Sequence, residues 1–397
     1  MSNQPPTTKP ESEIWRQGFG DWPIAAALLV MLLYGGFVSL YLYKANWDPS
    51  RLIVAGDYFV EMAEAPESLR ILKNSYGYDG QFVYRFALDP FTDEQTKFGI
   101  TIDSPAYRHQ RVMLPLLAWV LSGGNTGLVT WAILLVNIVC VGFVAFAGGT
   151  LARSVQLHSL TGVVIALYPG MLLSMARSLT EITAIGFVCL SLVLYQRKSW
   201  MAAGIMLSIA VLARETSIIF AAAIGLAWLA AWRRPQEFRI AWVVYALPLA
   251  TFILWQYWLY SNWGASPLFM QRSGRLVAPF TAFWQFWQES FEFRHSYQVV
   301  FFLECLYLAL LGLMTLLALR SPAPVALRLA WLVFAVIAFS LGHGVWVEDW
   351  SYLRVMTDYG VFALLILLYA RSWLRYPAYV VTVLTWGLVC AHVVLYR

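Results

Sequence analysis

Charge is scarce in this sequence. Asp, Glu, Lys and Arg make up 12% of its 397 residues, about half the share found in a soluble domain, while 60% of the residues are hydrophobic and the mean hydropathy is +0.63. A soluble fold of this length could not bury so much apolar surface. The scarcity of charge therefore excludes a soluble domain and predicts an integral membrane protein in contact with a lipid bilayer.

Cysteine and recognisable catalytic motifs are also scarce. The sequence has no HxxxH motif, no nucleotide-binding glycine loop and no serine nucleophile elbow. Its basic residues occur singly or in pairs between apolar runs, so the net charge of +5 indicates membrane orientation and no nucleic-acid partner. The cysteines all lie within apolar runs, where we expect packing residues rather than disulfides or metal ligands: Cys140, Cys189, Cys305 and Cys390.

Long apolar runs are what the sequence has instead. They range from 13 to 24 residues, and those of about 18 to 22 can cross the roughly 30 Å of a bilayer core. The first, Trp22–Tyr43, follows a polar tail (residues 1–20) that we expect to be disordered and cytoplasmic, and no small-residue cleavage site follows it. The later runs are Leu128–Leu151, Leu160–Ala176, Ile182–Tyr195, Met201–Ala213, Ile218–Trp232, Ile240–Tyr260, Val299–Leu319, Leu329–Trp346, Val355–Ala370 and Ala378–Tyr396.

The short basic loops decide the orientation, because positive loops face the cytoplasm. Val112–Ser122 is only about 11 residues long, too short to cross, so we interpret it as a helix at the outer membrane surface. All the basic loops then face the cytoplasm: Arg153–His158, Arg197-Lys198, Arg233–Arg239, Arg320–Arg328 and Arg371–Arg375. The sequence thus predicts an all-α polytopic membrane protein of about eleven spans, with the loop 44–127 and the C-terminus outside.

This long loop is the densest polar region of the chain. Its centre, Gly77–Gln81 (GYDGQ), has glycines that let the backbone turn and expose Asp79. Asp79 is either a turn or N-cap residue or a general base near the membrane. For Asp89, the following Pro90 more strongly indicates a turn residue. Pro90 would end a short helix with one face formed by Gln81, Tyr84, Arg85 and Leu88.

Basic residues follow on the same side. The segment Ser104–Arg111 (SPAYRHQR) contains Arg108 and Arg111, whose planar forks suit a lipid phosphate, although they could also simply reach toward headgroups. Three short outer loops carry further charge: Arg177–Glu181 (RSLTE, a local ion-pair spacing), Arg214-Glu215 and Glu348–Arg354 (EDWSYLR). These are either salt bridges between spans or, together with the acidic loop, the cations and the base that transfer from a lipid phosphate needs.

At these residues the sequence resembles the GT-C type membrane glycosyltransferases. The resemblance rests on Gly77–Gln81, Asp89–Phe91, Tyr107–Arg111 and Leu114–Trp119, and it covers roughly Trp22 to Trp232. It implies a catalytic module over residues 21–260 with the loop 44–127, and a variable module over 261–397. It also implies a bacterial inner-membrane enzyme of cell-surface glycopolymer formation, with a polyprenyl-phosphate-linked sugar as donor and a glycan or lipid as acceptor at the periplasmic face.

The resemblance also implies residue roles. Asp79 would deprotonate the acceptor hydroxyl for inverting transfer, while relatives often place the acid earlier, where Asp57 stands. Arg177, Arg214 and Arg108 or Arg111 would hold the leaving phosphate. A divalent cation, Mg²⁺ or Mn²⁺, near Asp57 or Asp79 is compatible with this scheme, although no spacing indicates it. The remaining candidates for substrate binding are Tyr78, Gln81, Arg85, Asp89, Tyr107, Glu181, Glu215 and Arg354.

Two other functions stay open. A transporter or flippase of a lipid-linked or polar solute would need ionisable groups at mid-depth, and Glu304 is the one that fits. A non-catalytic subunit of a polysaccharide machine would tolerate replacement of the loop carboxylates.

Overall fold

The structure, a computed structural model, describes residues 22–230, 242–267, 276–290, 295–348 and 351–396. The N-terminal tail 1–20, the basic loop Arg233–Arg239 and Asp349 of the EDWSYLR loop lie outside the described residues.

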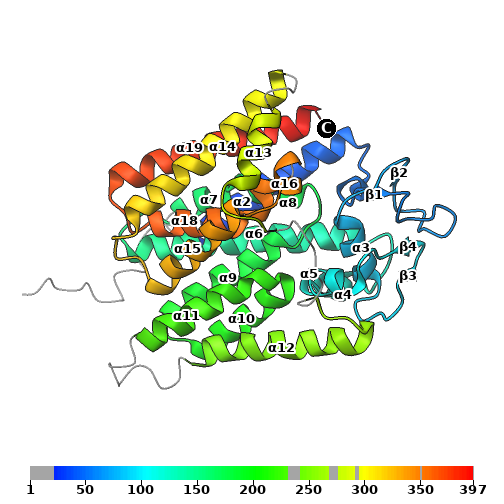
Figure 1. The fold of residues 1–397 in the computed structure, drawn as a ribbon, viewed down its shortest axis with the longest axis horizontal. Coiled ribbons are helices and arrows are strands. Elements are labelled where there is room, and N and C mark those ends of the chain that lie inside the picture. The colour runs from blue at the N-terminus through cyan, green and yellow to red at the C-terminus, as the bar shows by residue number, and fades with distance from the viewer. Residues whose placement is uncertain (1–21, 231–241, 268–275, 291–294, 349–350, 397) are drawn as a thin grey trace, which may run out of the picture.

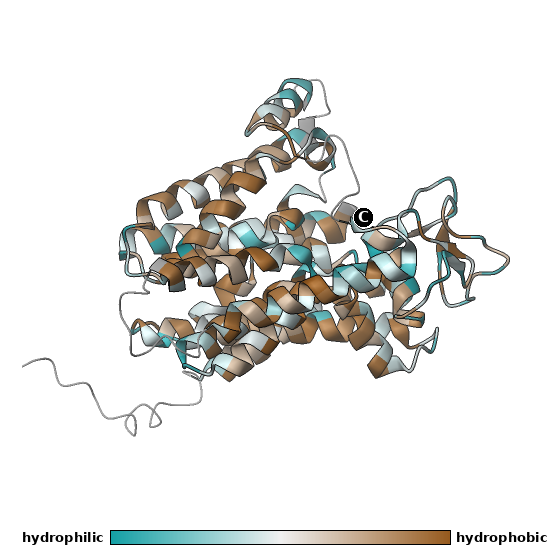
Figure 2. Cartoon of the chain, turned by 60° about the horizontal axis from the view of Figure 1, so that its bottom comes forward, coloured by the Kyte–Doolittle hydropathy of each residue, from teal (hydrophilic) through white to brown (hydrophobic). Residues whose placement is uncertain are grey.

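The described chain is mostly helical, and five of its helices are long and apolar enough to cross a membrane. Figure 2 shows apolar residues along these helices, which confirms the α-helical membrane character expected from the composition. The five are α2 (Pro23–Lys44), α6 (Val129–Ser154), α12 (Val243–Trp263), α14 (His295–Ala318) and α19 (Ser372–Tyr396).

Other apolar helices of the described chain are shorter than a full crossing. They are α5 (Met113–Ser122), α9 (Glu181–Gln196), α10 (Trp200–Ala213), α11 (Ile218–Ala230), α15 (Val325–Phe339) and α18 (Thr357–Leu367). Because length and composition identify five crossings, the total of about eleven spans stays a prediction.

Three expected runs are interrupted. Leu160–Ala176 forms two helices, because Pro169 lacks a backbone N–H and holds Tyr168 in a non-helical conformation. The hydroxyl of Tyr168 donates to the carbonyl of Leu353 at 3.0 Å, so two of these breaks pack against each other. The interrupted elements are α7 (Thr161–Ala166) with α8 (Pro169–Met175), α15 with α16 (His343–Val347), and α17 (Tyr352–Val355) with α18.

The helices bring the long loop and the C-terminal end of helix α19 to one end of the molecule (Figure 1). At this end Lys44 Nζ, at the end of α2, donates to the carbonyl of Val394 in α19 at 2.5 Å. At the other end of α2, Pro23 lies against Gly149 near the end of α6. The basic segments Arg153–His158 and Arg371–Arg375 overlap the last residues of α6 and the first residues of α19, so they lie at the end opposite the long loop.

The long loop contains short elements joined by turns. Asp89 caps the C-terminus of α3 just before Pro90, as the sequence predicts. The parallel pair β1–β2 aligns Ala55 with Ile71, and β3 pairs antiparallel with β4. The elements are η2 (Pro49–Leu52), β1 (Ala55–Gly56), β2 (Ile71–Leu72), α3 (Gly80–Leu88), β3 (Thr96–Lys97), β4 (Ile100–Thr101) and α4 (Pro105–His109). Beyond the loop the chain also forms η3 (Glu215–Ser217) and α13 (Thr281–Ser290).

Helix α5 has the short length expected of an interfacial helix. It ends at Gly123, which adopts φ 61° in the left-handed region that glycine allows. It buries Leu114 and Ala118 and exposes Val120 and Leu121. Its place at a membrane surface stays a prediction.

Candidate active site

Asp79 occupies the N-cap position of α3, but its side chain does not cap the helix. Instead its Oδ1 accepts a hydrogen bond from Arg108 Nη1 at 2.6 Å. The turn is set by Gly77, which has φ +64°, and by Gly80. Of the two interpretations of Asp79, this geometry removes the helix cap and leaves a carboxylate directed at a cation.

Gly80 joins two loops that are distant in the sequence. A Cβ at this position would lie 2.5 Å from the carbonyl oxygen of Arg177 and 2.6 Å from that of Ile53. Only a residue without a side chain permits this approach. The RSLTE turn therefore packs directly against the turn that presents Asp79.

Arg108 bridges two carboxylates. Its Nε and Nη2 donate to Asp103 at 2.8 and 2.9 Å, while Nη1 donates to Asp79. Its guanidinium also lies 4.4 Å from the ring centroid of Phe82. Asp103 was not among the sequence candidates, although its spacing of five residues from Arg108 was visible in the loop.

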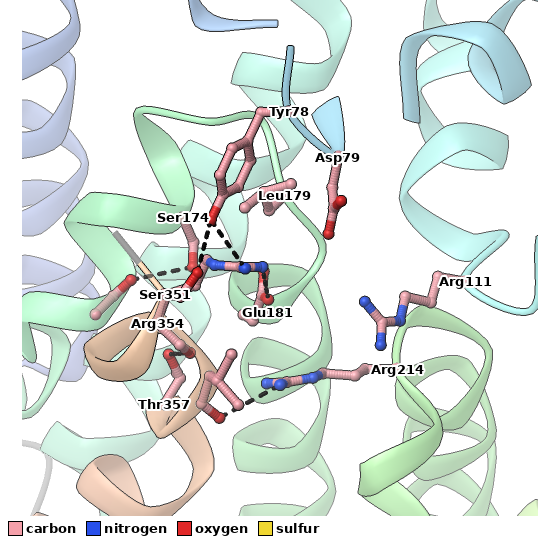
Figure 3. A network of polar contacts seen from close by, with 12 residues as sticks. Tyr78, Asp79, Arg111, Ser174, Leu179, Glu181, Arg214, Ser351, Arg354 and Thr357 are labelled. Carbon is pink, nitrogen blue, oxygen red and sulfur yellow. Dashed lines mark hydrogen bonds and ion pairs between the residues drawn. The ribbon is translucent and has the colours of Figure 1, made fainter. Parts of the chain in front are cut away.

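Three further ion pairs lie deeper, and Figure 3 shows several of these side chains around a common space. Arg111 forms a bidentate pair with Glu215, at 2.7 and 3.0 Å. Arg354 donates to Glu181 at 2.8 Å, so Glu181 pairs across the fold rather than through the local spacing with Arg177 that the sequence indicated.

The third deep pair joins Arg214 to Asp358, with Nη1 and Oδ2 3.5 Å apart. Thr216 donates to the same oxygen at 3.0 Å. Sequence reasoning missed Asp358, although the signal was present: it is the only acid in the apolar run Val355–Ala370, and an acid within such a run is usually functional or paired.

Tyr78 links the loop to the C-terminal part of the chain. Its hydroxyl accepts from Arg354 Nη2 at 3.1 Å and contacts Ser351 Oγ at 3.0 Å (Figure 3). The guanidinium groups of Arg177 and Arg354 lie 5.2 and 5.3 Å from the centroid of its ring. Tyr78 thus holds the acidic turn against two arginines from other loops.

Several of these residues line one cleft, hereafter called the cleft, whereas Tyr78, Arg177, Arg214 and Glu215 lie outside its lining. It contains about 390 Å³ of empty space. Its lining combines charged with aromatic and aliphatic side chains, which suits a ligand that has both polar and apolar parts. Its lining includes Asp79, Phe82, Phe86, Tyr107, Arg108, Arg111, Leu179, Glu181 and Arg354.

The arginines keep Asp79 ionised. Burial raises the pKa of Asp79, but Arg108, and then Arg354 and Arg111, outweigh it and hold this pKa below its usual value. Burial lowers the pKa of Arg108, yet Asp103 and Asp79 raise it above its usual value. Both groups are therefore charged at neutral pH.

Four sequence candidates support the loop and do not line the cleft. Asp57 accepts the backbone N–H groups of Asn74 and Ser75 at 2.8 and 3.0 Å, and these bonds hold the pKa of Asp57 below its usual value. Gln81 binds the backbone of Gly56 and Tyr76, and Asp89 pairs with Lys97 at 2.9 Å. Arg85 is fully buried and donates to Thr92 Oγ1 and the carbonyl of Glu94.

The expected divalent cation stays a prediction. Within residues 22–396, apart from the gaps in the description, no three His, Cys, Asp or Glu side chains group to hold a metal ion. The four cysteines form no disulfide; Cys140 and Cys189 are buried, and Cys305 and Cys390 are half-buried.

No known protein family, curated protein or solved structure matches this chain. The residues of the cleft are therefore what indicates a function for this chain.

Proposed function

We propose that this chain is a bacterial inner-membrane glycosyltransferase that uses a polyprenyl-phosphate-linked sugar at the periplasmic face to build a cell-surface glycopolymer. One observation carries the proposal. Asp79 is ionised at the edge of the cleft, its Oδ1 faces Arg108, and its Oδ2 has no hydrogen-bond partner among the described residues.

The chemistry follows from that free oxygen. Oδ2 of Asp79 takes the proton of the acceptor hydroxyl as the hydroxyl oxygen bonds to the anomeric carbon of the sugar. The bond from this carbon to the phosphate oxygen breaks on the opposite face, so the configuration inverts. The electron pair leaves with the lipid phosphate, which needs no proton, and one base is therefore sufficient.

The other cleft residues fit supporting roles. Arg108 keeps Asp79 charged and oriented. The half-buried pair of Arg111 with Glu215 and the buried pair of Arg354 with Glu181 hold the polar wall rigid. Phe82 and Phe86 offer an apolar wall for the lipid or for the face of a sugar ring.

The test is sugar transfer by the purified full-length chain in lipid nanodiscs, with a panel of polyprenyl-phosphate monosaccharides and labelled sugar. Asp79→Asn keeps the shape of the side chain and removes the base, so we expect at least about a hundredfold loss of rate. Asp57→Asn is the comparison variant, and we expect it to stay within about tenfold of wild type. Near-normal transfer by folded Asp79→Asn would remove Asp79 from the mechanism.

A transporter is the second candidate, and the interrupted helices favour it. Broken helices that pack together at depth are a feature of transporter sites, and Glu304, 4% exposed, hydrogen-bonds to Tyr352 next to such a break. Proteoliposomes containing the chain and a labelled lipid-linked sugar separate the two functions. Movement of the sugar across the bilayer without a glycosidic product would favour transport.

A further inference from the structure

A second pocket lies on the same loop. It contains about 670 Å³ of empty space and shares none of its lining residues with the cleft. We call it the basic pocket, because three of its residues are arginines and none is acidic. Its lining includes Tyr41, Arg51, Val54, Arg70, Leu72 and Arg177.

The positive charges of Arg51 and Arg70 are not neutralised by a carboxylate among the described residues. In the described parts of the chain, neither Arg51 nor Arg70 forms an ion pair. The acids on the adjacent segments are already engaged: Asp48 accepts from the N–H and hydroxyl of Ser50, and Asp57 accepts from the backbone of Asn74 and Ser75. An anion entering the pocket would therefore meet two cations, Arg51 and Arg70, that have no carboxylate partner among the described residues.

Backbone contacts hold together the loop segments that carry these cations. Ser50, on η2, accepts the backbone N–H of Arg70 through its hydroxyl at 2.9 Å, which ties together the segments that carry Arg51 and Arg70. The pairing of β1 with β2 holds the same two segments nearby. Arg177 reaches the pocket from the RSLTE turn, which is packed against Gly80. Binding would thus cost little reorganisation.

The position of the pocket indicates where the anion comes from. Tyr41 belongs to the last turn of α2, a helix long and apolar enough to span the membrane, so the pocket opens where that helix ends. Val54 and Leu72 add apolar wall beside the arginines. A phosphate attached to a hydrocarbon chain matches both parts, because guanidinium groups bind phosphate oxygens bidentately.

We propose that the basic pocket binds the phosphate group of a membrane lipid. That this lipid is the sugar donor rests on the proposed function, whereas the binding itself does not. In this scheme the basic pocket binds the phosphate. The arginines of the cleft do not, because they are already paired with carboxylates.

The test is equilibrium binding of farnesyl phosphate to the full-length chain in a neutral detergent. We expect Arg51→Gln and Arg70→Gln each to weaken binding about tenfold or more, because each removes a charge-assisted hydrogen bond. Lys73→Gln is the matched control: it removes one positive charge from an exposed residue of the same loop that does not line the pocket. If both arginine variants bind as Lys73→Gln does, the proposal is overturned.

Two further ligands identify the source of the phosphate. Farnesol should bind at least tenfold more weakly than farnesyl phosphate, and inorganic phosphate should compete only at far higher concentration. Equal affinity for inorganic phosphate and farnesyl phosphate would overturn the lipid source. If the wild-type chain binds farnesyl phosphate but transfers no sugar from any donor of the panel, the proposed function is wrong and the phosphate site stands.

Discussion

The cleft and the basic pocket lie on the same loop, yet their arginines differ in what they contact. In the cleft, Arg108, Arg111 and Arg354 each have a carboxylate partner. In the basic pocket, Arg51 and Arg70 have none within the described residues, and Arg70 is exposed to solvent. The two sites therefore use the same side chain for different purposes.

Burial explains the difference. The side chains of Arg354 and Glu181 are only 8% and 1% exposed, and a charge at such depth is stable only beside an opposite charge. A paired guanidinium orients its neighbours but has little attraction left for a ligand anion. An unpaired one near water keeps that attraction, which is what a binding site needs.

The largest expected effect is on stability. Arg354→Leu leaves Glu181 buried without its partner, so we expect a loss of about 3–5 kcal/mol in the free energy of unfolding. Arg70→Gln in the basic pocket should change the same quantity by no more than about 0.5 kcal/mol. Chemical unfolding in detergent measures both. Equal stability of the two variants would break the distinction between the two sites.

The buried histidine beside the cleft, His109, should make the stability of the protein depend on pH. His109 is fully buried; its Nε2 donates to the carbonyl of Pro90 and its Nδ1 accepts from Trp263. Burial, together with Arg85, lowers the pKa of His109 to about 4, against the opposing pull of Pro90 and Asp89. The imidazole is therefore neutral where the arginines of the cleft are charged and paired.

The sign of the pH dependence follows from this lowered pKa. Below about pH 6.5 the unfolded chain binds a proton on His109, whereas the folded chain does not. The free energy of unfolding therefore falls by about 3 kcal/mol as the pH drops to about 4. Unfolding curves at pH 7 and pH 4.5 measure the loss. His109→Gln should show a weaker acid dependence, and His158→Gln, at an exposed position, should keep it.

A smaller effect is expected where the two loops meet at Gly80. Gly80→Ala forces the carbonyls of Arg177 and Ile53 apart, at a cost of about 1–3 kcal/mol. Because the shift moves both Asp79 and Arg177, sugar transfer and farnesyl phosphate binding should weaken together. Gly35→Ala on α2, where no atom lies within 4 Å of the new methyl group, is the control. Weakening of only one activity would show that the sites are independent.

The smallest effect concerns the rim of the cleft. Asp103→Asn removes one partner of Arg108 and leaves Asp79, so unfolding should change by less than about 1 kcal/mol. Transfer should fall by less than tenfold. A loss as large as that of Asp79→Asn would mean that Asp103 also takes part in the chemistry.

Local signals in the sequence predicted the short helices of the long loop and part of the cleft. The glycines around Tyr78-Asp79 and the proline after Asp89 defined α3 to within a residue, and the 11-residue run indicated a short α5. Two of the charged loops that the sequence grouped together do meet, because Glu181 and Arg354 line the same cleft as Asp79. Backbone sterics and capping act over a few residues, which is why these features were readable.

Partners across the fold were not readable. The pairs of Glu181 with Arg354 and of Arg214 with Asp358 depend on how the broken helices α8, α17 and α18 pack, and no local pattern encodes that packing. Gln81 and Arg85 looked like ligands because they share a helix face, but every residue of α3 is buried. The shared pocket of Arg51 and Arg70 could not be predicted, because two arginines 19 positions apart (70 − 51) form no recognisable sequence motif.

The hydrogen bond from Arg354 to Tyr78 spans 276 positions of the chain, and it carries a consequence for biosynthesis. The ribosome delivers the acidic turn early and its arginine partner near the end of translation. Until Arg354 has been synthesised, Tyr78 and Glu181 both lack their contact with it. The cleft therefore closes after most of the chain has been inserted, and a truncated nascent chain would present Asp79 without the wall that completes its site.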